Sequence, residues 1–141
     1  MFSFRTTPLQ QQPDLILKGG KIGLLCNQTA WHPETGEYIF ESYARKGNLK
    51  RVFIPEHGLF GELQDQVKLN ETSIYNKLVP AGEEIEFVSL YGNSEESLYA
   101  SVGKLDDLDA LVIELQDVGC RYYTYISTVL NLFKVLKKEE I

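Results

Sequence analysis

Residues 21–29 read KIGLLCNQT, and this stretch decides the fold. Its first six residues, apolar apart from Lys21, predict a buried β-strand over residues 21–26. Gly19 and Gly20 precede the run, and three polar residues follow it at once. Strands with one solvent-exposed face alternate apolar and polar residues, whereas a continuous apolar run is typical of a strand inside a parallel sheet.

The same pattern returns further along the chain. Apolar runs predict strands over residues 50–55, 86–91 and 110–115. Helical spacing of apolar residues predicts helices over residues 37–46 and 125–138. A further helix is expected to be capped by Asn93 or Ser94 and to contain Leu98, Tyr99, Val102 and Leu105.

Strands that alternate with helices indicate an α/β fold: a mostly parallel sheet with helices on both faces, in three layers. Two stretches lie outside this alternation. Residues 1–13 are a polar lead-in. Residues 56–84 contain no convincing long element, and a loop of that length inside a compact domain is usually functional.

The composition is that of one soluble globular domain, with 141 residues, 43% of them hydrophobic and 24% charged. This length leaves little room for a second domain. The net charge is −6, and the longest basic cluster is Lys137-Lys138, so we expect neither nucleic-acid binding nor attraction to anionic membranes. An acidic protein can still bind an anionic small molecule where one local site supplies positive charge.

The sequence shows neither a membrane span nor a targeting signal. No apolar run approaches the roughly 20 residues that a span requires, and the first residues lack the apolar core of a signal peptide. We therefore expect a cytoplasmic protein, or a periplasmic or exported one from which a signal peptide has been removed. Cys26 and Cys120 have no zinc-ligand spacing, which favours two reduced thiols, while a disulfide between them stays open.

Polar clusters follow each predicted strand. The strand ends lead into residues 27–29, 55–58, 91–93 and 116–119. Because the carboxyl ends of parallel strands meet at one edge, where α/β proteins bind ligands, these clusters should converge on one cleft. Asn, Asp and Gly also favour turns and caps, which is the simpler interpretation of any single cluster. The side chains expected in the cleft are Gln28, Glu56, His57, Asp117 and Arg121.

Glu56-His57-Gly58 is the sharpest of these clusters. A carboxyl group beside an imidazole, just past a buried strand, can serve as a general acid when it is partly desolvated. Gly58 would let the backbone approach a ligand. The alternatives are a helix-capping Glu with a solvent-facing His, or a metal site of His57, Glu62 and Asp65 with His32. No strong metal-binding spacing supports the latter, and we expect no metal.

Residues 121–125 read RYYTY and form a second cluster. Aromatic rings at the mouth of a cleft can stack on a sugar, and Arg121 can hold a carboxylate through two hydrogen bonds. Some of these tyrosines are alternatively core residues at the start of a helix. No GxGxxG follows the first strand, so we expect no dinucleotide and no other cofactor.

Four segments in this order resemble the NamZ-type exo-β-N-acetylmuramidases, long described as a domain of unknown function. The segments are residues 23–29, 55–58, 89–92 and 116–128, and the resemblance covers about residues 20–140. The sequence departs from the family pattern at Cys26, Phe60 and Cys120, and residues 61–67 match it only loosely.

The resemblance implies a function. It implies that residues 1–141 are an N-terminal, Rossmann-like catalytic domain that lacks the family's smaller C-terminal domain. It also implies release of N-acetylmuramic acid from the non-reducing ends of peptidoglycan fragments, in bacterial cell-wall recycling. Glu56 is the expected catalytic acid. Asp117 is a candidate second carboxylate or orients His57, and the substrate's own 2-acetamido group is the alternative nucleophile.

The small carbohydrate would be held by Asn27, Gln28, Gly58, Tyr91, Gln116, Arg121 and Tyr123. In this hypothesis Arg121 binds the lactyl carboxylate, and Gln28 bonds sugar hydroxyls. Two other functions remain open: a muropeptide- or sugar-binding domain without turnover, and a domain that acts on a phosphorylated metabolite. The sequence leaves the oligomeric state undetermined.

Overall fold

The computed structural model describes residues 20–61, 75, 77–79, 83–92 and 94–138. Their centre is a four-stranded sheet in the order β5-β4-β1-β6, in which every neighbouring pair is parallel. The strands are β1 (Ile22–Cys26), β4 (Leu49–Ile54), β5 (Glu86–Ser89) and β6 (Ala110–Glu114). All four predicted strands are present, and each begins or ends within two residues of its expected bounds.

Strand β1 lies in the middle of the sheet because it is apolar on both faces. Leu24 pairs with Val52 of β4 on one side and with Val112 of β6 on the other. All five residues of β1 are buried. A Cβ on Gly23 would lie 2.6 Å from Leu108 Cδ1 and 3.0 Å from the Phe53 ring, so any other residue there would have to displace the Leu108 side chain.

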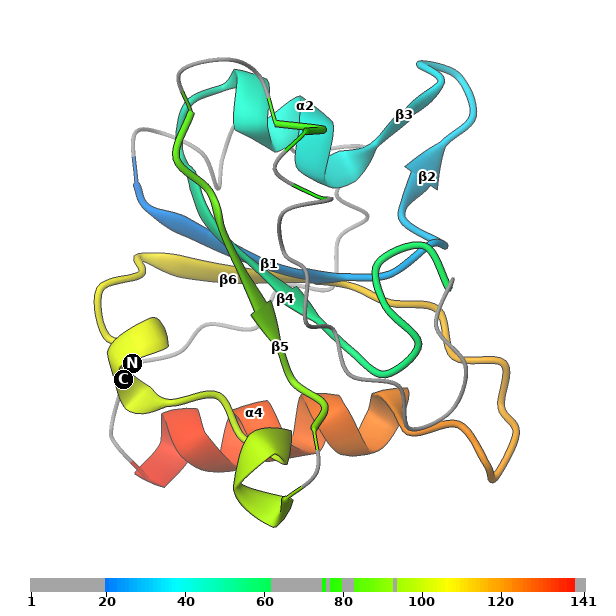
Figure 1. Ribbon diagram of the computed structural model, residues 1–141, viewed down its shortest axis with the longest axis vertical. Helices are drawn as coiled ribbons and strands as arrows, with labels where there is room; N and C mark the ends of the chain where they lie inside the picture. Colours follow the sequence, from blue (N-terminus) through cyan, green and yellow to red (C-terminus); the bar gives the residue numbers. More distant parts are fainter. Residues whose placement is uncertain (1–19, 62–74, 76, 80–82, 93, 139–141) are drawn as a thin grey trace.

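The two faces of the sheet are covered by different helices (Figure 1). Leu24 packs with Phe40 and Tyr43 of α2 (Ile39–Arg45), in a core on one face. Leu25 packs with Leu132 of α4 (Tyr125–Lys138), in a second core on the other face. The prediction of a three-layer α/β fold is therefore confirmed, and α4 has its predicted bounds.

Two predicted helices differ from those found. The helix expected over residues 37–46 begins later, because Glu37–Tyr38 pairs as β3 with β2 (Trp31–His32). The helix expected after Asn93 is wrong: η2 (Glu95–Leu98) and η3 (Val102–Lys104) are short 3₁₀ turns. Ser97 Oγ bonds the Ser94 carbonyl, and Gly103 lies inside the second turn; both features weaken a continuous helix.

Several predicted features lie outside the described residues. These are the lead-in of residues 1–13, the capping Asn93 and most of residues 61–74, among them Glu62 and Asp65. Within the described part of the chain, no helix is long and apolar enough to cross a membrane.

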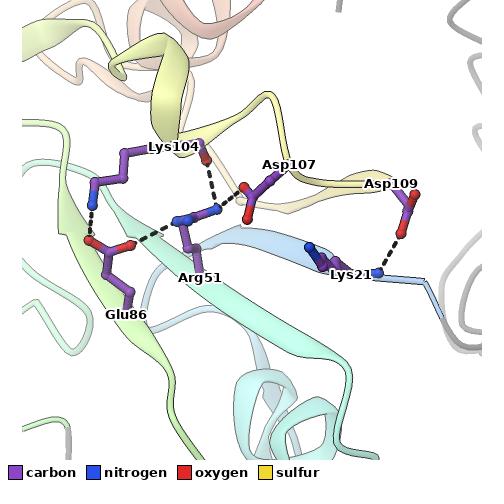
Figure 2. Close-up of polar contacts among 6 residues, drawn as sticks. All are labelled: Lys21, Arg51, Glu86, Lys104, Asp107 and Asp109. Atoms are coloured by element: carbon purple, nitrogen blue, oxygen red, sulfur yellow. Dashed lines mark hydrogen bonds and ion pairs between the residues drawn. The ribbon is translucent and has the colours of Figure 1, made fainter.

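The amino-terminal end of the sheet carries a network of charges (Figure 2). Arg51 Nε of β4 donates to Glu86 Oε2 of β5 over 2.8 Å, and the Arg51 guanidinium also pairs with Asp107. Lys104 of η3 pairs with the other oxygen of Glu86. Nearby, the backbone N–H of Lys21 donates to Asp109 Oδ2 over 2.7 Å. The network ties β4 and β5 to the segment that leads into β6.

Replacing Glu86 with glutamine should lower the melting temperature at pH 7 by about 1–3 °C, because partly exposed ion pairs are worth under about 1 kcal/mol. Burial raises the pKa of Glu86, but hydrogen bonds from Lys104 and Arg51 outweigh it and hold that pKa below its usual range. The stability that Glu86 adds is therefore complete above its unfolded pKa of about 4.3 and lost as the pH falls through the lower native pKa.

The check is thermal unfolding between pH 7 and pH 3. The gap between the native chain and the Glu86→Gln variant should close as the pH falls through that range. Glu84→Gln, at an exposed neighbouring position, is the control and should match the native chain. A gap independent of pH would contradict the electrostatic explanation.

Candidate active site

The loops after β1 and β6 meet at the carboxyl edge of the sheet. From β1 the chain adds β4 and then β5 on one side, and it then crosses back to place β6 on the other side of β1. The strand order therefore reverses at the boundary between β1 and β6, and open α/β sheets bind ligands at such a point. Thr29, after β1, accepts a hydrogen bond at Oγ1 from the backbone N–H of Gln116, after β6, over 3.2 Å. The structure therefore brings these two predicted clusters together.

Asn27 shapes the loop that follows β1. The side chain is fully buried, and its Oδ1 accepts hydrogen bonds from Thr29 N over 3.1 Å and from Thr29 Oγ1 over 2.7 Å. Asn27 Nδ2 has no hydrogen-bond partner among the described residues. Gln28 lies next to Gly61, where a Cβ would stand 3.3 Å from the Gln28 amide. Asn27 thus orders this loop, and both N–H donors of its Nδ2 group are without a partner among the described residues.

Glu56 is a buried carboxyl group at the carboxyl edge of the sheet. It follows Pro55, which ends β4, and it is 7% exposed. Its Oε2 accepts a hydrogen bond from Thr124 Oγ1 over 2.6 Å, and Thr124 directly precedes α4. This contact joins residues 68 positions apart. A buried carboxyl group with one fixed oxygen is a candidate for acid–base chemistry.

The next two residues turn the chain sharply. His57 has φ of 72° and Gly58 has φ of 83°, both in the left-handed region. That region is uncommon for a residue other than glycine, and such residues cluster at functional sites. The ring of His57 lies 6.3 Å from the ring of Tyr123, centre to centre. Gly58 N donates to the Pro55 carbonyl over 3.3 Å.

The segment before α4 presents aromatic and basic side chains. Tyr122 is 88% exposed and Tyr123 is 41% exposed, and Arg121 beside them is exposed as well. Tyr125 is 3% exposed and belongs to the core. This agrees with the alternative prediction that some of these tyrosines are core residues at the start of a helix. The Tyr123 and Tyr125 rings meet edge to face, with centres 5.6 Å apart.

Asp117 makes a local hydrogen bond. Its Oδ1 accepts from the backbone N–H of Gly119 over 2.7 Å, and its Oδ2 has no hydrogen-bond partner among the described residues. The hypothesis that Asp117 orients His57 therefore stays a prediction.

The backbone of Tyr91, after β5, is hydrogen-bonded to Ser89. Ser89 Oγ donates to the Tyr91 carbonyl over 2.9 Å and accepts from the Tyr91 N–H.

Two polar residues near this edge were not predicted as site residues from the sequence. Thr124 lies inside the RYYTY cluster, and its position just before a helix was the signal that could have singled it out. Glu114 ends β6 opposite Cys26 of β1. Burial raises the pKa of Glu114, and the charge of His32 partly opposes that change. Burial, with the nearby Glu114 charge, also raises the pKa of Tyr43 to about 12.

No cluster of three or more His, Cys, Asp or Glu side chains that could hold a metal ion occurs in the described ranges. Cys26 is buried and Cys120 is exposed, and both are free thiols. Burial raises the pKa of the Cys26 thiol, with the Glu114 charge as a smaller cause.

The parallel sheet, its two covering helices and the polar carboxyl edge define a Rossmann-like α/β domain. The chain belongs to the family described as exo-β-N-acetylmuramidase NamZ, N-terminal, whose model matches residues 22–141. The family resemblance predicted from the sequence is thus confirmed. The family is one of peptidoglycan glycosidases.

Two relatives give the scale of the likeness. The peptidoglycan β-N-acetylmuramidase NamZ of Bacillus subtilis (strain 168) is 29% identical over 126 residues, which are 89% of this chain and 28% of that protein. A crystal structure of a DUF1343 family protein from Bacteroides fragilis NCTC 9343 superposes with a TM-score of 0.68 at 25% identity, over 94% of this chain and 30% of that one. The chain therefore spans less than a third of either relative.

Proposed function

We propose that this chain is the catalytic N-terminal domain of an exo-β-N-acetylmuramidase, which releases N-acetylmuramic acid from the non-reducing ends of peptidoglycan fragments. Membership of the NamZ family supports the substrate class. The observation that carries the proposal is Glu56, a buried carboxyl group at the carboxyl edge whose Oε2 is fixed by Thr124 over 2.6 Å.

The proposed reaction begins with proton transfer from Glu56 to the glycosidic oxygen. The bond from that oxygen to the anomeric carbon of muramic acid breaks, and the leaving sugar departs as an alcohol. In one route the substrate's 2-acetamido oxygen first forms the new bond to the anomeric carbon, and water then replaces it and gives a proton back to Glu56. In the other route water forms that bond directly and gives its proton to Asp117, the proposed second carboxylate. Among the described residues, Thr124 bonds one oxygen of Glu56 and leaves the other for the substrate.

The exposed side chains before α4 are the proposed sugar contacts. Tyr122 and Tyr123 offer ring faces for stacking, and the Arg121 guanidinium offers paired donors for the lactyl carboxylate. The loops around them would supply hydrogen bonds to hydroxyl and acetamido groups. These proposed contacts are Asn27, Gln28, Gly58, Tyr91 and Gln116.

Arg121→Ala should raise KM about tenfold for muramic-acid-terminated substrates, because a hydrogen bond to a charged group is worth about 1.5–3 kcal/mol and this one is exposed. The kcat should change little. The measurement is steady-state kinetics on a chromogenic muramide and on the matching glucosaminide, which lacks the lactyl group. Arg45→Ala, on the exposed end of α2, is the control. An equal loss on both substrates would remove Arg121 from carboxylate recognition.

The test of the function is incubation with a disaccharide that ends in N-acetylmuramic acid, followed by mass spectrometry. Two forms are assayed: the 141-residue chain, and a chimaera that joins it to the part of the Bacillus subtilis relative without a counterpart here. Free N-acetylmuramic acid from either form supports the proposal. If both forms are folded and neither releases it, the proposal fails.

A sugar-binding domain without turnover is the second candidate function. The exposure of Tyr122 and Tyr123 favours it, since aromatic faces at a surface bind sugars without any catalytic group. Calorimetry with the same disaccharide distinguishes the two candidates: binding without release of product supports this one. The cellular compartment of the protein, cytoplasmic or exported, remains a prediction from the sequence.

A further inference from the structure

Trp31 is a half-exposed aromatic ring on the hairpin of β2 and β3, which follows β1. It is the first residue of β2 and the single tryptophan of the chain, and 46% of it is exposed. The Trp31 ring meets the Tyr38 ring of β3 edge to face, with centres 4.9 Å apart. The next residue of β2, His32, has a buried Nδ1. Trp31 therefore presents an open ring surface on a fixed support.

Backbone hydrogen bonds hold this hairpin at the carboxyl edge of the sheet. In the turn before it, Ala30 N donates to the Asn27 carbonyl over 3.0 Å. Where α2 begins, Ile39 N donates back to the Ala30 carbonyl over 2.9 Å. Figure 1 shows the hairpin on the α2 side of this edge, while residues 115–124 run from the end of β6 to α4 on the other side.

The loop that carries Glu56 touches both the hairpin and the segment before α4. On the hairpin side, the Phe60 ring of this loop lies 5.0 Å from the ring of Tyr38, centre to centre, and Tyr38 supports Trp31. On the other side, Glu56 Oε2 accepts the hydrogen bond from Thr124. Exposed aromatic rings therefore flank the Glu56 loop on two sides, with Trp31 on one side and the tyrosines before α4 on the other.

A polar group without a partner accompanies the Trp31 ring. Gln28 lies in the turn just before the hairpin and beside Gly61 of the Glu56 loop. Its Oε1 is buried and has no hydrogen-bond partner among the described residues. Small-molecule sites combine aromatic surface with a few placed polar groups, and a sugar needs both, for its C–H face and for its hydroxyls. Trp31 and Gln28 offer this combination.

We propose that Trp31 is the stacking platform for the sugar on the leaving side of the cleaved bond, which in peptidoglycan is N-acetylglucosamine. This inference rests on the proposed function, which assigns muramic acid to the aromatic and basic side chains before α4. The catalytic carboxyl groups of a glycosidase flank the scissile bond, so a sugar lies on each side of that bond. Because muramic acid takes the α4 side of Glu56, the leaving sugar takes the side of Trp31.

A neutral sugar suits the hairpin better than a peptide. The turn between β2 and β3 carries the exposed carboxylate of Glu34, and the nearby Arg45 already pairs with Glu37. The peptides of peptidoglycan carry carboxylates, which Glu34 would repel. N-acetylglucosamine carries no charge.

Tryptophan fluorescence tests the contact directly. Because Trp31 is the single tryptophan, excitation at wavelengths that tyrosine does not absorb reports on its ring alone. The Glu56→Gln variant of the 141-residue chain is used, so that the disaccharide is not consumed. The disaccharide that ends in N-acetylmuramic acid should shift the emission, as should N-acetylglucosamine at higher concentration. Free N-acetylmuramic acid should leave the emission unchanged.

Three fluorescence results would overturn the proposal. A shift with free N-acetylmuramic acid equal to that with the disaccharide would place Trp31 on the muramic acid side. A shift only with a disaccharide that carries a peptide would make a peptide the occupant. An unchanged emission with the disaccharide, N-acetylglucosamine or both at saturating concentration would leave Trp31 without a sugar.

Steady-state kinetics gives a second measurement, in whichever form turns over. Trp31→Ala should lower kcat/KM for the disaccharide about three- to tenfold, the range expected of one aromatic contact. The glycosyl fluoride of N-acetylmuramic acid has no sugar on the leaving side, so its kcat/KM should not change. Trp31→Phe keeps a flat ring and should keep most of the activity on the disaccharide. Val102→Ala, at an exposed apolar position in η3, is the control.

Melting temperatures show that each variant is folded. If Trp31→Ala unfolds, Trp31→Leu takes its place, since leucine keeps an apolar contact with Tyr38 but lacks the flat ring. An equal loss on the disaccharide and the fluoride would overturn the proposal, as would native kinetics on the disaccharide. Release of N-acetylmuramic acid that is indifferent to Trp31 leaves the proposed function standing. A fluorescence shift without any release contradicts the proposed catalysis and not the sugar contact.

Discussion

Glu56→Gln should lower kcat on a chromogenic muramide by about 10²–10⁴-fold, the usual contribution of a general acid. Glutamine has nearly the same shape, and its amide oxygen can still accept the hydrogen bond from Thr124 Oγ1. What it loses is the proton that the glycosidic oxygen needs. The loss should therefore appear in kcat and kcat/KM alike, with little change in KM.

The measurement uses whichever form turns over, the 141-residue chain or the chimaera. Glu84→Gln makes the same chemical change at an exposed position before β5, and it should keep full activity. A substrate with a highly acidic phenol as leaving group needs less protonation, so it should recover much of the lost rate. Near-native kcat in Glu56→Gln on a poor leaving group would remove Glu56 from the catalytic role.

Thr124→Val should lower kcat/KM by about 10–100-fold, because the carboxylate that forms as Glu56 gives up its proton loses a hydrogen bond worth about 1.5–3 kcal/mol. Valine keeps the volume of threonine but cannot donate to Glu56 Oε2, which lies 2.6 Å from the hydroxyl. The carboxyl group, 7% exposed, would then lose its only described partner and its fixed orientation.

Thr124→Ser separates this role from packing. Serine restores the hydroxyl, so its kcat/KM should lie within a few-fold of the native value. Thr35→Val, in the exposed turn between β2 and β3, is the neutral control. If the serine variant is as slow as the valine variant, the methyl group matters and the hydrogen bond does not. The melting temperature of each variant confirms that it is folded.

The sequence predicted the sheet well because its strands carry their own signal. An apolar run such as residues 22–26 is typical of a strand inside a sheet covered on both faces. The helix expected after Asn93 was wrong. It was predicted from the apolar spacing of Leu98 and Val102, which does not take into account the low helix propensity of the neighbouring serines and Gly103.

The candidate site was predictable only in part. The polar residues at the strand ends predicted a polar carboxyl edge. The hydrogen bond from Gln116 to Thr29 confirms that the loops after β1 and β6 meet there. The partner of Glu56 was not predictable, since Thr124 is 68 residues away and depends on how α4 is placed. Glu114 was missed because it ends an apolar run and reads as part of the strand.

The charge network and the carboxyl edge lie at opposite ends of the sheet, so the overall charge of this protein can change at one end with little electrostatic effect at the other. Five residues of β1 span roughly 17 Å, about two Debye lengths at physiological ionic strength. Substitutions of surface residues near Arg51 and Glu86, such as Glu84, can therefore alter the isoelectric point while salt screens the carboxyl edge from them. A lineage, or a laboratory, can adapt its solubility at one end of the sheet and leave the chemistry at the other end alone.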